Sequence, residues 1–129
     1  MKSALFLIAL IAAAACTQQA TTTTTTMQTG VKEFNVVVGH TFYDPSSFQV
    51  NEGDTVRFLA LAAPGTASHN HGMTIDEFGI DEAVIDEREP KVIEFVAVKK
   101  GSFKVYCAPC WEGPYGRGHP DIEATLVVK

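Results

Sequence analysis

The side chains of this chain best suited to bind a metal ion lie in two short segments. Cys107 and Cys110 form the pattern Cys-Ala-Pro-Cys, and His119 follows them on the same connection. His71 lies far upstream, directly before the sequence Gly-Met-Thr-Ile. Thiolate sulfur and imidazole nitrogen are donors typical of copper, zinc and iron–sulfur centres. We therefore predict a metal site if the fold brings these two segments together.

The connection that carries both cysteines joins two predicted strands. It runs from Cys107 to Ile122 and is rich in glycine and proline. Connections of this length in a compact domain are usually functional. The segment around His71 lies at the end of another predicted strand, so the thiols and one or two imidazoles could meet at one end of the domain.

The body of the chain consists of short apolar runs separated by turn residues, including a predicted turn at Asn51–Asp54. We expect Asp76–Ile85 to be a turn or an irregular loop. Strands at this spacing, without alternating helices, indicate an all-β sandwich or barrel. The predicted strands are Phe34–Val38, Ser47–Val50, Thr55–Leu61, Met73–Ile75, Lys91–Val98, Phe103–Cys107 and Ala124–Val128.

The N-terminus has the features of an export signal. Lys2 precedes an unbroken apolar run from Ala4 to Ala15. That run is shorter than the ~20 residues of a membrane span and suits a signal peptide. Small residues lead into Cys16, a pattern that resembles a lipobox, in which the cysteine is lipidated and begins the mature protein. The alternative is ordinary cleavage nearby, which would leave a soluble exported protein.

The sequence divides into a signal, a tether and one domain. Residues 1–15 are the predicted signal peptide, and residues 16–30 are Cys16 followed by a Thr-rich segment with no charge. Such a segment is expected to be disordered because it has almost nothing to bury. Residues 31–129 form the predicted domain. The formal net charge of −5 argues against a nucleic-acid partner, whose binders normally present a basic face.

Copper is the metal that we favour for an exported, acidic β-sandwich with this donor set. Zinc and an iron–sulfur centre use similar donors and are the alternatives. Cysteine binds metal as the thiolate, so binding displaces a proton. A rigid sandwich would hold the ligands in one geometry in both oxidation states of the metal, which suits electron transfer.

Four segments, in order along the chain, resemble the cupredoxin family. Asn51–Phe58 is similar to the turn and strand of cupredoxins, and Gly101–Cys107 is similar to the strand that leads to their cysteine ligand. His71–Ile75, followed by Glu77–Ile80, resembles the first-ligand loop of the copper-A domain of cytochrome c oxidase subunit II. Gly118–Val128 resembles the closing histidine and the last strand. The resemblance implies a Greek-key β-sandwich.

The resemblance also implies a role for each matching residue. His71 and His119 would be the imidazole ligands, Cys107 the principal thiolate and Cys110 a second thiolate, as in copper-A. The copper-A pattern is Cys-x3-Cys-x3-His-x2-Met, whereas this chain has Cys-x2-Cys-x8-His-x2-Ile. Ile122 therefore stands where a thioether ligand is expected and cannot bind metal. We favour one copper over two for this reason, with both centres kept as alternatives.

A second resemblance is to the red copper protein nitrosocyanin. Ile75–Ile80 is similar to its corresponding segment, and Asp44-Pro45 lies where that protein carries a Glu-Pro whose carboxylate binds copper. Asp44 is thus a possible oxygen ligand. Because Asp before Pro is also a common turn starter, a structural role is the alternative.

Several residues near the predicted site also have simpler interpretations. Cys107 and Cys110 could form a disulfide, which we expect in a metal-free or oxidised protein, or a thioredoxin-like redox pair. His69 and His40 are weaker candidates for ligands. Trp111 is expected to pack over the site.

The sequence thus predicts a copper-binding electron-transfer lipoprotein. It would lie on the outer face of the cytoplasmic membrane or in the periplasm and exchange electrons with a cytochrome or terminal oxidase. It would be a carrier rather than an enzyme on its own, or else a component similar to oxidase subunit II. The acidic residues of the domain could steer a basic redox partner. The alternatives are copper trafficking or storage and, less favoured, thiol oxidoreduction by Cys107 and Cys110.

Overall fold

The computed structural model describes residues 29–66, 71–108, 110 and 122–129. These residues form two facing β-sheets and one short 3-10 helix, η1 (Asp76–Phe78). The strands are β1 (Val31–Val38), β2 (Tyr43–Asp44), β3 (Ser47–Val50), β4 (Thr55–Ala62), β5 (His71–Ile75), β6 (Ile80–Ile85), β7 (Lys91–Val96), β8 (Gly101–Tyr106) and β9 (Glu123–Val128).

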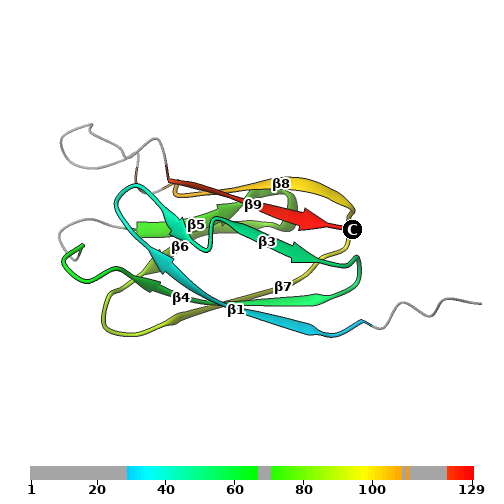
Figure 1. Ribbon diagram of the computed structural model, residues 1–129, viewed down its shortest axis with the longest axis horizontal. Helices are drawn as coiled ribbons and strands as arrows, with labels where there is room; N and C mark the ends of the chain where they lie inside the picture. The colour runs from blue at the N-terminus through cyan, green and yellow to red at the C-terminus, as the bar shows by residue number, and fades with distance from the viewer. Residues whose placement is uncertain (1–28, 67–70, 109, 111–121) are drawn as a thin grey trace, which may run out of the picture.

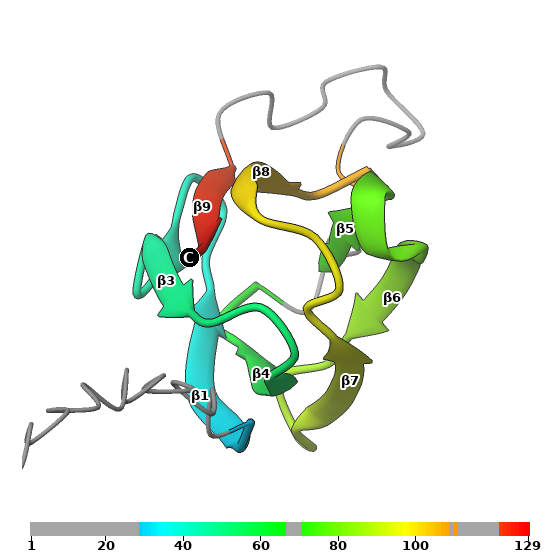
Figure 2. The same ribbon diagram turned by 90° about the vertical axis from the view of Figure 1, so that its right-hand side faces the viewer.

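The two sheets are a four-stranded sheet with the order β2-β1-β4-β7 and a five-stranded sheet with the order β3-β9-β8-β5-β6. Figure 1 shows the strands running lengthwise, and Figure 2 looks along them with the two sheets on either side of the core. Both sheets are mixed, because β1 pairs in parallel with β4 and β3 with β9. The predicted all-β sandwich is confirmed.

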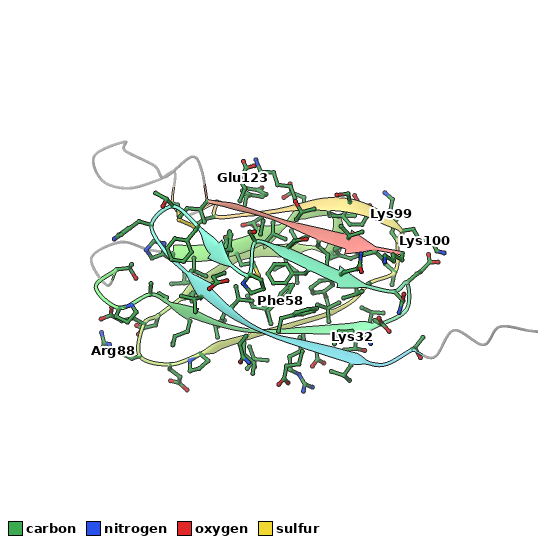
Figure 3. All side chains as sticks on the ribbon, in the orientation of Figure 1. Lys32, Phe58, Arg88, Lys99, Lys100 and Glu123 are labelled. Atoms are coloured by element: carbon green, nitrogen blue, oxygen red, sulfur yellow. A yellow bond between two sulfur atoms is a disulfide. The ribbon has the colours of Figure 1, made fainter. Side chains whose placement is uncertain are left out.

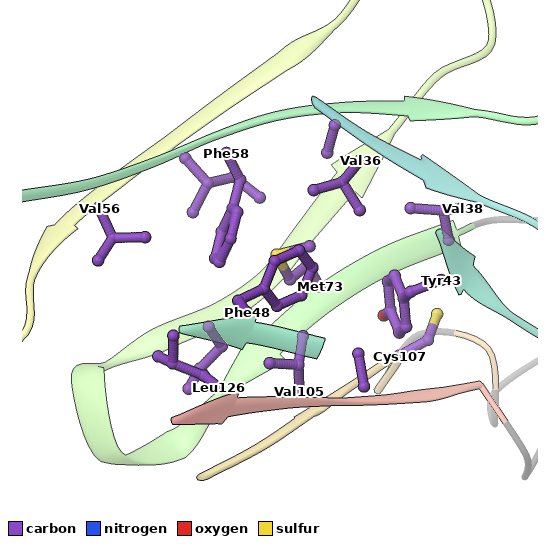
Figure 4. Close-up of a cluster of buried hydrophobic side chains, with 14 of the residues drawn as sticks. Val36, Val38, Tyr43, Phe48, Val56, Phe58, Met73, Val105, Cys107 and Leu126 are labelled. Atoms are coloured by element: carbon purple, nitrogen blue, oxygen red, sulfur yellow. The ribbon is translucent and has the colours of Figure 1, made fainter. Parts of the chain in front are cut away.

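The alternation of side chains in β4 shows how the sequence builds the core. Every second residue of this strand, from Val56 to Ala62, is buried, as expected for a strand with one face against a core. Phe58 is fully buried at the centre (Figures 3 and 4), with its ring 4.7 Å from that of Phe48 and 5.9 Å from that of Phe95. Such aromatic contacts stabilise the fold by more than the burial of their surface area alone.

The segment Asp76–Ile85, expected to be irregular, contains an additional strand. Glycine makes this possible: Gly79 ends η1 in the left-handed conformation, with φ 64°, and the chain then returns as β6 beside β5. Acidic residues such as Asp81 are rare in strands, which is why the pattern did not indicate one. They are tolerated because β6 is an edge strand. The two-residue strand β2 was also not predicted.

One end of the sandwich collects the segments predicted to bind metal. At the left of Figure 1, β5 and β9 begin and β8 ends, so Cys107 follows β8 directly beside the start of β5. The predicted signal peptide, Cys16 and the tether up to residue 28 lie outside the described residues, as do His69, Trp111 and His119. Among the described residues, none of the helical segments is long and apolar enough to cross a membrane.

Candidate metal centre

His71 occupies a buried position at the start of an inner strand. It is the first residue of β5, whose five residues are all buried because β5 lies between β6 and β8 and faces the core. The imidazole of His71 is completely inaccessible to solvent. A polar ring in such a place needs partners.

Antiparallel pairing brings Cys107 to the same place. Thr74 of β5 pairs with Tyr106 of β8, so the residue after Tyr106 lies alongside the residues that precede Thr74. The backbone N–H of Gly72 donates a hydrogen bond to the Sγ atom of Cys107 over 3.1 Å. Cys107 is 1% exposed. The strand register therefore fixes this sulfur next to the backbone of the histidine strand.

Cys110 completes a cluster of three donor residues. Its Sγ atom lies 3.7 Å from Nδ1 of His71, and it is joined to Cys107 by a disulfide. One donor atom from each of His71, Cys107 and Cys110 falls within 4.8 Å of the others, and all three residues are buried. The structure thus brings together three of the four predicted ligands and also contains the disulfide considered as an alternative.

Tyr43 anchors the histidine strand to the opposite sheet and was not predicted from the sequence. Its hydroxyl donates a buried hydrogen bond of 2.7 Å to the carbonyl oxygen of Gly72. Burial raises the pKa of Tyr43 above its usual range, so the phenol stays protonated and remains a donor. Figure 4 shows Tyr43 and Cys107 at the same end of the core. Gly72 therefore links β2 to the cysteine through its carbonyl and its amide.

The remaining candidate residues that the structure describes lie outside this donor cluster. Asp44 is exposed, because side chains alternate along β2 and its neighbour Tyr43 faces the core. Among the described residues, it is not part of the donor cluster. Ile122, where the resemblance to copper-A places a thioether, is buried and apolar. His40, a weaker candidate, lies with its ring centroid 5.2 Å from that of His71.

The chemistry of this donor set fits a soft or borderline metal ion. Two sulfurs and one imidazole nitrogen are donors that copper, zinc and iron–sulfur centres accept. The sulfurs bind only as thiolates, so the Cys107–Cys110 disulfide must first be reduced by two electrons. Burial of the three residues excludes water and competing ligands. The cluster can therefore exist either as a disulfide or as a dithiolate site.

No protein-family model matches the chain, and no curated protein matches its sequence. Solved structures, in contrast, share its architecture. The periplasmic domain of subunit II of cytochrome oxidase from Bradyrhizobium japonicum is 13% identical with a TM-score of 0.59, and the match covers 75% of this chain and 83% of that one. Auracyanin A, a blue copper protein from Chloroflexus aurantiacus, is 14% identical with a TM-score of 0.58, and the match covers 78% and 100%.

A chain of a heme-copper terminal oxidase also shares the architecture of this protein. A heme-copper terminal oxidase is 15% identical with a TM-score of 0.57, and the match covers 76% of this chain. The chain spans 65% of that oxidase chain, slightly less than two thirds. At these identities the likeness is one of fold. The chain has the cupredoxin fold that the sequence predicted.

Proposed function

We propose that this protein is a copper-binding electron carrier whose metal site is built from His71, Cys107, Cys110 and His119. The observation that supports it most directly is the buried His/Cys/Cys cluster at one end of a cupredoxin sandwich. His119 is included as a ligand because of the sequence resemblance to cupredoxins. A bound copper ion would supply one-electron redox chemistry there.

The surrounding chain is suited to hold the ligands of such a site in place once the disulfide is reduced. His71 and Cys107 are fixed by two paired strands, and Gly72 is held on one side by Tyr43 and on the other by the sulfur of Cys107. Rigid donors change little in position when the oxidation state changes, which lowers the barrier to electron exchange. The N–H of Gly72 also offsets negative charge on the Cys107 thiolate.

Copper stoichiometry and electron paramagnetic resonance test the proposal most directly. The protein is reduced with a dithiol, freed of the reductant without oxygen, and titrated with copper. An electron carrier should give an intense thiolate-to-copper(II) visible band. One copper per chain with a one-nucleus hyperfine pattern would establish a mononuclear site, whereas two coppers sharing one unpaired electron would establish a copper-A-like site. No copper uptake by the reduced protein would refute the proposal.

Two variants separate the roles of the sulfurs. Cys107→Ser should abolish the visible band, because it removes the proposed principal thiolate, the sulfur that accepts the N–H of Gly72. Cys110→Ser should shift the band and change the spectrum if Cys110 is a second thiolate. An unchanged spectrum would remove Cys110 from the site. Asp44→Asn serves as a matched control, because the structure leaves that carboxylate exposed.

The same preparation distinguishes the alternatives. Colourless copper(I) binding with rapid transfer to a chelator would favour trafficking or storage. The Cys107–Cys110 disulfide supports the second alternative, a thiol oxidoreductase. Such an enzyme would reduce disulfides without metal, and Cys107→Ser would lose this activity. The burial of both cysteines weighs against it, because reactive cysteines of that class are partly exposed.

We further propose an exported location and a redox partner. The apolar run in residues 1–15 would direct export, and lipidation of Cys16 would hold the domain at the outer face of the membrane. The natural partner would be a cytochrome or a terminal oxidase, in keeping with the oxidase folds that the chain resembles. Mass spectrometry of the mature protein tests the lipid, and Cys16→Ser should release the domain from the membrane fraction.

A further inference from the structure

His40 lies on a tight turn between β1 and β2, at the same end of the sandwich as the donor cluster. The N–H of Gly39 donates a hydrogen bond of 2.9 Å to the carbonyl of Phe42, which closes the turn. A Cβ atom on Gly39 would lie only 2.3 Å from Cε1 of Phe42, so a larger residue there would displace the exposed Phe42 ring. Thr41 and Phe42 face solvent, whereas His40 is half-buried.

The imidazole of His40 lies next to that of His71, a member of the donor cluster. Its ring centroid lies 5.2 Å from that of His71, with the planes tilted by 60°, and its Nδ1 atom is buried. Two imidazoles that bind one ion through nitrogens about 2.0–2.1 Å from it have ring centres roughly 5–6 Å apart. The two rings are therefore already at a separation that a shared metal ion would accept.

We propose that His40 is a further metal ligand of this centre, an inference that rests on the proposed copper function. In the disulfide form, the atoms within 4.8 Å of one another belong to His71, Cys107 and Cys110. Reduction separates the two sulfurs and opens the space between them. Rotation of the half-buried His40 ring then brings a nitrogen to the metal, without movement of β1 or β2.

Binding of the metal by His40 would connect the two sheets of the sandwich. His40 follows β1 of the four-stranded sheet, whereas His71 lies in β5 and Cys107 directly follows β8, both strands of the five-stranded sheet. A metal bound by both histidines would therefore link the two layers of the sandwich. Because a ligand that binds only the native state stabilises it, copper should raise the melting temperature more when this link is present.

Three variants test His40 as a ligand. His40→Phe keeps an aromatic ring against His71 but removes both nitrogens, His40→Ala removes the ring, and Thr41→Val is the matched control on the same turn. Each reduced protein is titrated with copper against a competing chelator. Pulsed electron paramagnetic resonance of protein carrying 15N-labelled histidine then counts the bound imidazoles.

We expect both His40 variants to lose one bound imidazole, to bind copper at least about 10-fold more weakly, the lower bound for loss of an indirect partner, and to gain less thermal stability from it. Thr41→Val should match the wild type. If His40→Phe keeps the wild-type affinity and imidazole count, His40 only packs against His71 and the inference is overturned while the copper function stands. If the reduced wild type takes up no copper, the proposed function fails and the inference fails with it.

Discussion

The two ends of the sandwich bury polar groups in opposite ways. At the far end, the carboxylate of Asp54 is buried and accepts backbone N–H groups from Gly30 at 3.0 Å and from Asn51 at 2.8 Å. At the site end, His71 and the two cysteines are buried with their donor atoms directed toward one another. The first arrangement holds a carboxylate with backbone N–H donors, and the second gathers sulfur and nitrogen atoms that could bind a metal ion.

The far end therefore contributes to the stability of the fold, whereas the site end holds the candidate metal ligands. The turn that holds Asp54 is also tied by the N–H of Gly53 to the carbonyl of Ala97, and the far end carries the exposed lysines labelled at the right of Figure 3. Changes there should alter folding and leave metal binding intact. Changes at the donor cluster should do the reverse, and the following variants test this expectation.

The largest effect is expected for His71→Ala. Loss of even an indirect partner of a metal ligand costs about 10–100-fold in affinity, so loss of this ligand should weaken copper binding at least about 100-fold, or roughly 2.8 kcal/mol. Isothermal titration of the reduced protein with copper(I) provides the measurement. Copper binding within a few-fold of the wild type would show that the cluster is not the metal site.

Asp54→Asn should give the largest effect on folding among changes at the far end. The N–H groups of Asn51 and Gly30 hold the pKa of Asp54 below its ordinary value. Its contribution to stability is therefore present above the carboxyl pKa of the unfolded chain and is lost as the pH falls through the lower folded pKa.

Urea denaturation at neutral and acidic pH measures this contribution. The wild type should be the more stable protein at neutral pH, and the difference between the two proteins should shrink in acid. Copper affinity should not change in Asp54→Asn. A stability difference that is independent of pH would contradict the assignment.

Tyr43→Phe tests the anchor that joins the site to the opposite sheet. Removing the hydroxyl leaves the carbonyl of Gly72 buried without this donor, which should cost about 1–3 kcal/mol of unfolding free energy. Because Gly72 also contacts the sulfur of Cys107, the visible band of the copper form should shift. A stability loss with an unchanged spectrum would limit Tyr43 to a structural role.

The smallest effect is expected for Lys99→Gln. Lys99 forms an exposed ion pair with Glu77, and such pairs contribute less than about 1 kcal/mol. The loss of stability in the variant should be smaller in high salt, because salt screens the attraction between exposed charges. A larger or salt-independent loss in thermal denaturation would show that this pair does more than its exposure suggests.

The strands could be predicted where one face is buried. Ser47–Val50 was predicted with the bounds that the structure shows, and β4 differs by one residue, because alternating burial leaves a clear pattern. The strand β6 was missed because Asp81, an acidic and exposed residue of low strand propensity, lies on this edge strand. The strand β2 is too short to leave a pattern.

The site could be predicted only in part. The types and order of His71, Cys107 and Cys110 were sufficient to group them, because few donor sets combine thiols and imidazoles on such loops. Tyr43 and His40 gave no signal of equal strength. A tyrosine beside a turn and a histidine after a strand are common, and their relation to His71 depends on how the two sheets face each other.

The fold class and the donor types of the candidate site could be read from the residues, because burial patterns and donor atoms are properties of the amino acids. Which of these groups lie together depends on strand pairing and sheet packing. The register of Thr74 with Tyr106 sets Cys107 beside the histidine strand, and the packing of the two sheets brings His40 and Tyr43 to the same place. These contacts join residues far apart in the chain, and their distances follow from pairing and packing.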